Sequence, residues 1–516
     1  MDTKAKFLEE ITSAYTFKGD SIILGAPKLD QAVLTDTFIR IPLKTLNRHG
    51  LIAGATGTGK TKTLQIIIEQ LSAKGIPSLV MDVKGDLSGV AVPGESNPKV
   101  EERNNSIGIP FTTSGSPVEF LTLSHDSGAR LRATVLEFGP VLFSKILELN
   151  DTQASVISMI FKFCDDHQLL LLDLDDIKKV LNYVINEGKE ALSAEYGAIS
   201  PATIGTILRK VIELEQQGGD IFFGERSFDV NDLIRTNERG EGYISVLRVT
   251  DIQDRPKLFS TFMLQLLAEI YSTFPEAGDL DKPKLVIFID EAHLIFNEAS
   301  KALLSQIETI IKLIRSKGIG IFFVTQSPRD VPDSVLGQLG LKVQHALRAF
   351  TAKDRKDIKL TAENYPLSDY YTVDTLLTEL GIGEAIIAAL NEKGIPTPLV
   401  HCYLRSPQSR MDILTPAEIN NIMSQSRIKT KYDEVINRES AYEILTEKLS
   451  ANTSDVETPV PNTPKTSAKP EKSTLDQILN SSAGRQIGRT VANTLVRGIL
   501  GVLTGGSKSS KKSSWF

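Results

Sequence analysis

The stretch LIAGATGTGKTKTLQ, residues 51–65, constrains the fold of this 516-residue chain more than any other feature. It contains a complete GxxxxGK[ST] motif between a strand-like run and a helix-like run, which is the context that supports such a motif. Glycines let consecutive backbone N–H groups point inward around phosphates, and the start of the helix adds positive charge. The sequence therefore predicts a loop that binds ATP. The residues expected to bind it are Gly54, Ala55, Thr56, Gly57, Thr58, Gly59, Lys60, Thr61 and Lys62.

Short apolar runs alternate with helical patterns on both sides of this loop. Strands are expected at HGLIAG, IPSLVMDV and VEFLTL, and later at GYISVLRV, KLVIFID, IGIFFVTQ and LKVQHALRA. Helices are expected at 60–74, around 256–273 and around 299–316. Nearly continuous apolar strands separated by helices are typical of a parallel sheet covered on both faces. The predicted fold class is α/β with a mainly parallel sheet.

The pattern changes along the chain and predicts several segments. Runs such as QASVISMIFKFC have apolar residues three and four apart, which indicates helices, whereas ANTSDVETPVPNTPKTSAKPEKST has no periodicity and indicates a disordered linker. We expect a short β-rich lead-in (1–45), the first part of the core (46–125), an all-helical insertion (126–240), the second part of the core with C-terminal helices (241–450), the linker (451–474) and a basic amphipathic tail ending in a short helix (475–516).

Acidic and polar residues follow two of the expected core strands. KLVIFIDEAH ends a buried strand at Asp290 and Glu291, and IFFVTQ ends another at Gln326. Thr61 and Asp290 are the residues expected to hold Mg²⁺, Lys60 is expected to reach the β and γ phosphates, and Glu291 is expected to polarise the attacking water. Gln326 would contact the γ-phosphate or that water.

Two further groups are candidates for the same site. MDVKGD places Asp82 at the end of a strand with Lys84 after it, where a simple turn is an equally good interpretation. Phosphoryl transfer usually needs an arginine, often from a neighbouring subunit. Arg315 in LIRSKGIG and Arg348 in QHALRAF are the candidates, and each could equally be an ordinary surface arginine.

The net charge of the chain limits how it could bind nucleic acid. The net charge is −6 and the pI about 5.7, so contact with nucleic acid requires a local basic patch. RK at 209–210 and TAKDRKDIK at 351–359 are candidates, although two aspartates interrupt the second run and favour an ordinary solvated face. Cys164 and Cys402 have no metal-binding spacing, and no apolar run is long enough to span a membrane, so a cytoplasmic protein is expected.

Four stretches together resemble the HerA/FtsK superfamily of P-loop ATPases, and more narrowly the bacterial HerA-like proteins. They are GATGTGKT, MDVKGDLSG, VIFIDEAHLIF and IRSKGIGIFFVTQSP. The resemblance implies a RecA-like core, a homo-hexameric ring with ATP between subunits, and double-stranded DNA passing through the centre. Only about 45 residues precede the P-loop, where HerA proper has a β-barrel that docks a nuclease, and this argues against a nuclease partner.

Two other classes of protein remain open at this point. One is an ATPase that acts on protein partners or as a regulatory switch without DNA, which the acidic pI and the lack of a recognisable DNA-reading module allow. The other is a non-catalytic assembly protein, which has no need of a water-activating Glu291. The basic tail is a further candidate site for a protein partner, a DNA duplex or a membrane surface.

Overall fold

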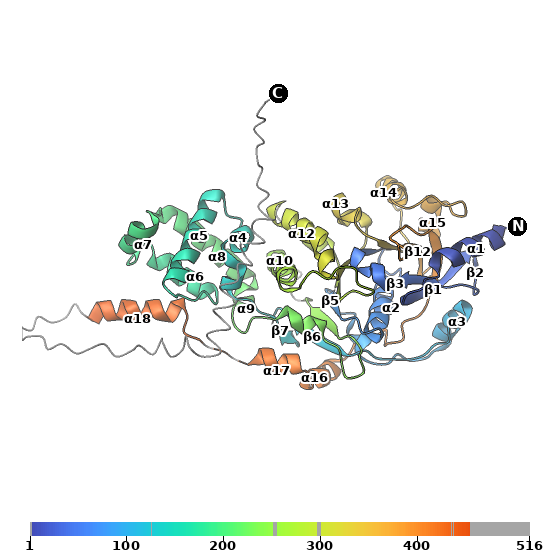
Figure 1. Cartoon of the computed structure of the whole chain (residues 1–516), viewed down its shortest axis with the longest axis horizontal. Coiled ribbons are helices and arrows are strands. Elements are labelled where there is room, and N and C mark those ends of the chain that lie inside the picture. Colours follow the sequence, from blue (N-terminus) through green and yellow to red (C-terminus); the bar gives the residue numbers. More distant parts are fainter. Residues whose placement is uncertain are drawn as a thin grey trace, which may run out of the picture. The chain divides into compact units, whose positions relative to one another are not determined.

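The computed structural model describes residues 3–124, 126–250, 255–296, 301–434, 436 and 438–454. The chain forms two compact units, which Figure 1 shows coloured along the sequence. The first combines Met1–Thr134 with Ile212–Asn437, and the second combines Val135–Val211 with the chain from Arg438 onward. The first residues of the expected linker, 451–454, belong to the last described helix; the rest of the linker and the basic tail lie outside the described residues.

All strands belong to the first unit, where the described residues form one 13-stranded sheet. The order is β2-β1-β13-β12-β11-β4-β10-β9-β5-β8-β6-β7, with β3 paired to β1. The strands are β1 (Ser21–Leu29), β2 (Ala32–Val33), β3 (Ile39–Pro42), β4 (Gly50–Ala53), β5 (Ser78–Asp82), β6 (Val118–Thr122), β7 (Ala129–Arg130), β8 (Ile244–Arg248), β9 (Leu285–Ile289), β10 (Ile319–Thr325), β11 (Leu341–Gln344), β12 (Glu384–Ala388) and β13 (Val400–Leu404).

The sheet is parallel from β11 to β7 and antiparallel from β11 to β1. Every residue of β4, β5, β9 and β10 is buried, because these strands are mostly apolar and are covered on both faces. In parallel strands the carboxyl ends share one edge, so the residues that follow β4, β5, β9 and β10 meet there. The predicted α/β class with a mainly parallel sheet is confirmed.

Helices and short helical turns connect the strands of the first unit. They are α1 (Thr3–Tyr15), α2 (Lys60–Ala73), α3 (Pro98–Ile107), α9 (Asp220–Phe222), α10 (Pro256–Thr273), α11 (His293–Phe296), α12 (Lys301–Ile314), α13 (Asp333–Leu336), α14 (Ala352–Ala362), α15 (Val373–Glu379), α16 (Pro416–Ser424) and α17 (Arg427–Asp433). The turns are η1 (Leu43–Arg48), η2 (Ser88–Ala91), η3 (Glu215–Gly219), η4 (Val230–Ile234), η5 (Arg315–Lys317) and η6 (Pro328–Asp330).

The second unit is helical. It contains α4 (Val135–Ile146), α5 (Asp151–Asp166), α6 (Leu174–Tyr183), α7 (Lys189–Tyr196), most of α8 (Pro201–Leu214) and α18 (Ala441–Ser454). Asn150 and Asp173 each start a helix with a reciprocal capping box. Asp176 accepts the backbone N–H of Tyr442 at 2.8 Å, which fixes the start of α18 against α6.

Two expectations differ from the observed elements. The lead-in, expected to contain only strands and turns, begins with α1, whose Phe7, Ile11 and Tyr15 are fully buried at helical spacing. The expected insertion of 126–240 is longer than the helical unit, because β7 joins the sheet and residues from Ile212 onward pack with the first unit.

Candidate nucleotide-binding site

The GxxxxGK[ST] motif forms the loop between β4 and α2. Gly54, Gly57 and Gly59 have φ angles of 153°, 78° and 111°, a region that favours glycine because a Cβ would clash with the backbone. A Cβ on Gly54 would also lie 2.5 Å from the Cβ of His345. The glycines are therefore required by the path of the loop, as the motif predicts.

Main-chain hydrogen bonds hold this loop from three sides. The N–H of Gly54 donates to Thr325 O at 3.2 Å, at the end of β10. The N–H of Ala55 donates to Ala346 O at 2.8 Å, just beyond β11. The N–H of Gly383 donates to Thr58 O at 3.1 Å, just before β12. The loop is thus fixed to the ends of its two neighbouring strands and to the first antiparallel strand beyond them.

Lys60 is the first residue of α2 and is only 7% exposed. Its Nζ donates to Gly54 O at 2.7 Å and to Ala55 O at 3.1 Å, so the ammonium group lies inside the loop. Burial lowers the pKa of Lys60, and the nearby Lys84 lowers it further. A bound phosphate would offset both effects. Lys62, by contrast, donates to the backbone oxygen of Met411.

Asp290 and Glu291 follow β9 at the same edge of the sheet. Asp290 is 5% exposed, and burial raises its pKa to about 7. Glu291 has a φ of 50°, in the left-handed region that few residues other than glycine adopt. Its Oε1 lies 2.5 Å from Lys84 Nζ, and its Oε2 lies 3.2 Å from His293 Nδ1. Lys84 therefore holds one oxygen of this buried carboxylate, whereas the other, Oε2, has no hydrogen-bond partner.

The turn after β5 supplies a further acid that the sequence analysis did not select. Asp82 accepts the N–H groups of Gly85, Asp86 and Leu87 at 2.7, 3.2 and 3.2 Å, so its role in the structure is to shape this turn. The turn brings Asp86 Oδ2 within 3.2 Å of the Thr61 hydroxyl, which donates to it. The sequence signal for Asp86 was its place in the run KGD, residues 84–86, shortly after Asp82.

These oxygen atoms fit Mg²⁺. Asp86 Oδ1 is buried and has no hydrogen-bond partner, and it belongs to the carboxylate that contacts Thr61. Hydroxyl and carboxylate oxygens are the ligands that Mg²⁺ prefers. Within the described part of the chain, no three His, Cys, Asp or Glu residues are placed to hold a metal by themselves.

Gln326 lies directly after β10, beside the P-loop. Its Oε1 is 3.5 Å from the Thr56 hydroxyl, so the structure brings this residue to the loop. The two arginine candidates are separated. Arg348 is exposed and follows β11, at the same edge as the P-loop. Arg315 is exposed in η5, which precedes β10, and therefore lies at the opposite edge of the sheet.

His345 is a second residue that the sequence analysis did not select. It is fully buried, its Nε2 lies 2.9 Å from the Thr63 hydroxyl, and its backbone N–H donates to Ala53 O at 2.7 Å. Burial lowers its pKa to about 4, and the positive charge of Lys60 lowers it further. His345 thus packs a neutral ring between the P-loop and α2. A lone histidine has no sequence pattern that signals this role.

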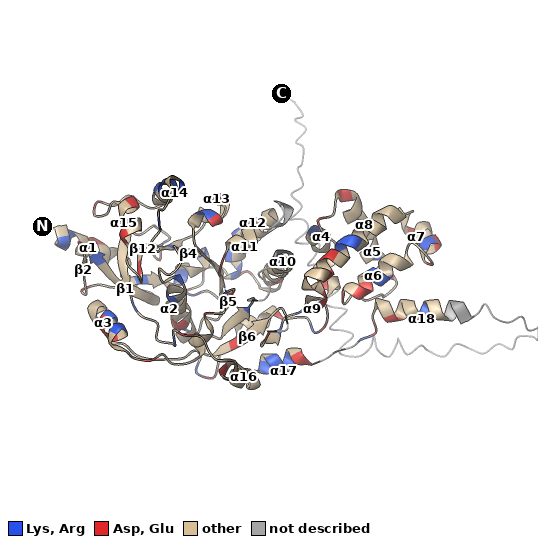
Figure 2. Ribbon diagram, turned by 180° about the vertical axis from the view of Figure 1, so that it is seen from behind, with Lys and Arg blue, Asp and Glu red and all other residues tan. Residues whose placement is uncertain are grey.

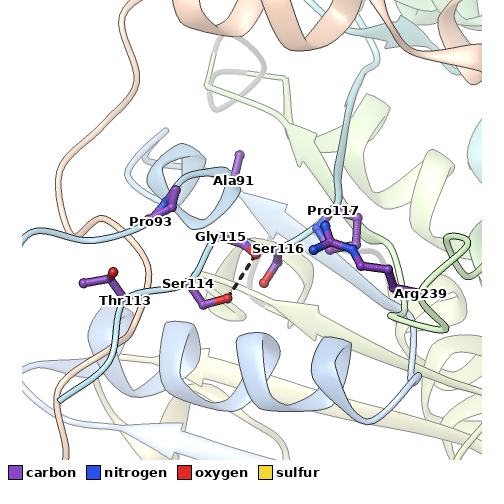
Figure 3. Close-up of a pocket in the computed structure, with 8 residues that line it drawn as sticks. All are labelled: Ala91, Pro93, Thr113, Ser114, Gly115, Ser116, Pro117 and Arg239. Atoms are coloured by element: carbon purple, nitrogen blue, oxygen red, sulfur yellow. Dashed lines mark hydrogen bonds between the residues drawn. The ribbon is translucent and has the colours of Figure 1, made fainter.

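Figure 3 shows a pocket elsewhere in the first unit, with a volume of about 440 Å³. Its lining comes from the segments before β6 and β8, and it contains no residue of the P-loop. The lining residues are Ala91, Pro93, Thr113, Ser114, Gly115, Ser116, Pro117 and Arg239. The Arg239 side chain lies 3.4 Å from Glu241, so its charge is partly compensated.

The family model for the helicase HerA-like C-terminal domain matches residues 28–509. The chain belongs to this family. This confirms the resemblance stated from the four motifs, and together with the site it makes the chain a HerA-like P-loop ATPase. No helix in the described residues is both long and apolar enough to cross a membrane.

Known relatives of this HerA-like chain are distant. The DNA double-strand break repair helicase HerA of Sulfurisphaera tokodaii is 22% identical over 368 residues, which cover 70% of this chain and 66% of that protein. The probable helicase MJECL08 of Methanocaldococcus jannaschii is 25% identical over 412 residues, 75% of this chain and 71% of that protein. The chain thus spans about two thirds of the length of these relatives.

Solved structures share the fold of the HerA-like chain. The bacterial conjugative coupling protein TrwBdeltaN70 superposes with a TM-score of 0.50 and 12% identity, over 79% of this chain and 94% of that one. The plasmid coupling protein TrwB in complex with a non-hydrolysable ATP analogue gives a TM-score of 0.50 and 14% identity, over 79% of this chain and 94% of that one. The core is therefore a RecA-like P-loop fold.

Proposed function

We propose that this chain is a Mg²⁺-dependent ATPase that assembles as a homo-hexameric ring and translocates on, or remodels, double-stranded DNA. The observation that carries the proposal is the meeting of Lys60, Glu291 and Gln326 at one edge of the sheet in a HerA-like chain. Curated relatives named as DNA double-strand break repair helicases support DNA as the polymer.

Each group in the site has a task in hydrolysis. Lys60, already inside the loop, would bind the β and γ phosphates, and Glu291 would orient and polarise the attacking water. Thr61 and Asp290, with Asp86, would hold Mg²⁺, which would neutralise phosphate charge. Gln326, whose side chain contacts Thr56, would contact the γ-phosphate and transmit its loss through β10.

The opposite locations of the two arginines suggest different tasks. A residue that completes the neighbouring subunit's site must lie away from its own P-loop, as Arg315 does. Arg348 lies close to its own P-loop, since the neighbouring Ala346 is bonded to Ala55. We therefore assign the arginine finger to Arg315 and a role within the same subunit to Arg348.

The test is steady-state ATP hydrolysis with Mg²⁺, with and without long linear duplex DNA. We expect DNA to stimulate turnover, and we expect both Lys60→Ala and Glu291→Gln to abolish it. The loss in Glu291→Gln should be about 10²- to 10⁴-fold, as for other general bases. An equal rate of ATP hydrolysis with and without DNA would contradict the proposed DNA motor and favour an ATPase that acts on protein partners. Lack of turnover in the wild type would favour a nucleotide-dependent assembly factor.

A further inference from the structure

Helix α14 carries a strongly basic exposed face. Lys353, Arg355, Lys356 and Lys359 are all exposed, whereas Ile358 and Thr361 are buried. At about 3.6 residues per turn, the four cations fall within an arc of about 160°, opposite the buried side chains. Figure 2 shows Lys and Arg gathered on this helix, at the upper left of the view. We call these four residues the basic face.

The two aspartates that interrupt this run are already engaged. Asp354 accepts the N–H groups of Thr351 and Phe350 at 2.8 and 3.0 Å, and so closes the capping box of the helix. Asp357 pairs with Arg329. Within the described part of the chain, none of the four cations forms an ion pair. The four cations of 351–359 are exposed to solvent, as expected for a solvated face, and they gather on one side of the helix.

Such a face is unfavourable for the helix itself. Lys353 and Lys356, and Lys356 and Lys359, are three residues apart, and Arg355 and Lys359 are four apart. Like charges at these spacings destabilise a helix, by about 0.2–0.5 kcal/mol for each pair at four apart. The chain as a whole is acidic, with a net charge of −6. The four cations thus gather positive charge on one exposed face of the helix, as a polyanion-binding surface requires.

The basic face is attached directly to the P-loop. The segment between β11 and α14 begins with His345, which packs on Gly54, and Ala346, which accepts the N–H of Ala55. Six residues later α14 begins. A force on α14 therefore reaches the P-loop through one short, continuous stretch of backbone.

We propose that the basic face of α14 binds the phosphate backbone of duplex DNA, and that DNA bound there acts on the P-loop through residues 345–351. This inference rests on the proposed function, because it names the surface that would hold the DNA. The contacts are to phosphates, so they add affinity without sequence preference.

The test compares two variants with the same change in charge. In the first, Lys353, Arg355, Lys356 and Lys359 are all replaced by Gln. In the control, the exposed Lys4, Lys99, Lys312 and Lys393, which lie outside α14, are replaced by Gln. Fluorescence anisotropy with a labelled linear duplex is recorded from about 50 to 200 mM salt. The slope of log K against log salt should shrink by about 3 to 4 in the first variant, at about 0.9 for each phosphate contact. In the control it should keep its wild-type value.

Thermal unfolding midpoints check that both variants fold. The smaller change, Lys356→Gln with Lys359→Gln, should reduce the slope by about 2 and keeps the test valid if the larger variant unfolds. Stimulation of ATP hydrolysis by DNA should fall with affinity in both α14 variants. An unchanged slope would overturn the proposal, and so would equal loss of binding in the control. Equally tight binding of poly-glutamate, lost in the same variants, would also overturn it in favour of an acidic protein partner.

The two proposals fail in different ways. If DNA stimulates hydrolysis and the α14 variants bind like the wild type, the motor stands and the basic face is overturned. If the wild type binds DNA through α14 but DNA does not change the rate of ATP hydrolysis, the basic face remains supported as a DNA-binding surface. The proposed DNA motor and the coupling through 345–351 are then overturned. If the wild type binds no DNA, both are overturned.

Discussion

The contact between Lys84 and Glu291 is the residue-scale feature with the clearest consequence for catalysis. Glu291 is buried, and its Oε1 lies 2.5 Å from Lys84 Nζ. A carboxylate oxygen that is paired in this way is occupied by the ammonium group and is not free to accept a hydrogen bond from water. To polarise the attacking water, Glu291 must weaken this contact. Lys84 is half exposed and lies on the turn that also carries Asp86, so events at the phosphates can reach it.

We predict that Lys84→Met raises ATP turnover in the absence of DNA by about two- to fivefold. The range corresponds to an ion pair worth about 0.4–1 kcal/mol, which is appropriate for a partly exposed lysine. Methionine retains the length of the side chain and removes its charge. The measurement is kcat and KM for ATP without DNA. A fall in kcat together with a rise in KM would instead show that Lys84 binds phosphate.

At the scale of elements, His49 connects three parts of the core. It precedes β4, its Nε2 lies 2.9 Å from Ile311 O in α12, and its Nδ1 accepts the N–H of Ile321 in β10 at 3.0 Å. One nitrogen accepts and the other faces a carbonyl oxygen, so the ring is held in its neutral form. Burial lowers the pKa of His49 to about 4, below the 6.5 of an exposed histidine.

We predict that His49 makes the protein less stable as the pH falls from about 6.5 toward 4. The unfolded chain takes up the proton first, so the stabilisation is complete above 6.5 and is lost through the folded pKa. The loss between about pH 7 and pH 5 should be about 2 kcal/mol. Asp82 and Asp290, whose pKa values are raised to about 6 and about 7, act in the opposite direction.

The measurement is therefore a difference between proteins. The change in unfolding free energy between the two pH values should be smaller in His49→Gln than in the wild type. The exposed His167→Gln serves as the matched control and should behave like the wild type. An identical pH dependence in His49→Gln and the wild type would contradict the prediction.

Much of the core sheet and of the P-loop could be predicted from the sequence, because the patterns that indicate them lie within short stretches of the chain. The run LVIFI is apolar throughout, and it forms β9 with Asp290 directly after it. The glycines of the P-loop have the backbone angles that their motif implies. The missed features depend on contacts that are distant in sequence. His345 acts through Thr63, and the antiparallel pairing of β12 with β13 depends on the whole edge of the sheet.

At the scale of the whole molecule, the placement of Arg315 predicts how subunits share a site. We expect Arg315→Ala to lose most ATP turnover while it still binds ATP, because its own P-loop is intact. In a mixture with Lys60→Ala subunits, turnover should return in part. The restored sites would pair an intact P-loop from one variant with an intact Arg315 from the other. A mixture of Arg348→Ala and Lys60→Ala subunits should regain no ATP turnover. Each substitution would inactivate the site of its own subunit, so no subunit in the mixture would have an intact site.

The measurement is ATP turnover of the mixtures against the mole fraction of each variant, with sedimentation velocity to confirm assembly. A mixture of Arg315→Ala and Lys60→Ala that remains inactive while forming rings would place the finger elsewhere.

The anchoring of the P-loop also has a consequence for how such a chain can diverge. The loop is tied to its surroundings through peptide groups, at Ala55 and Ala346 and at Thr58 and Gly383. Every residue except proline offers the same N–H, and every residue offers the same carbonyl. The side chains of Ala55 and Ala346 can therefore be exchanged over evolutionary time while the loop keeps its shape, whereas Gly383, with a φ of 73°, favours glycine. Related proteins can thus acquire a different substrate-binding surface while the nucleotide-binding loop keeps its structure.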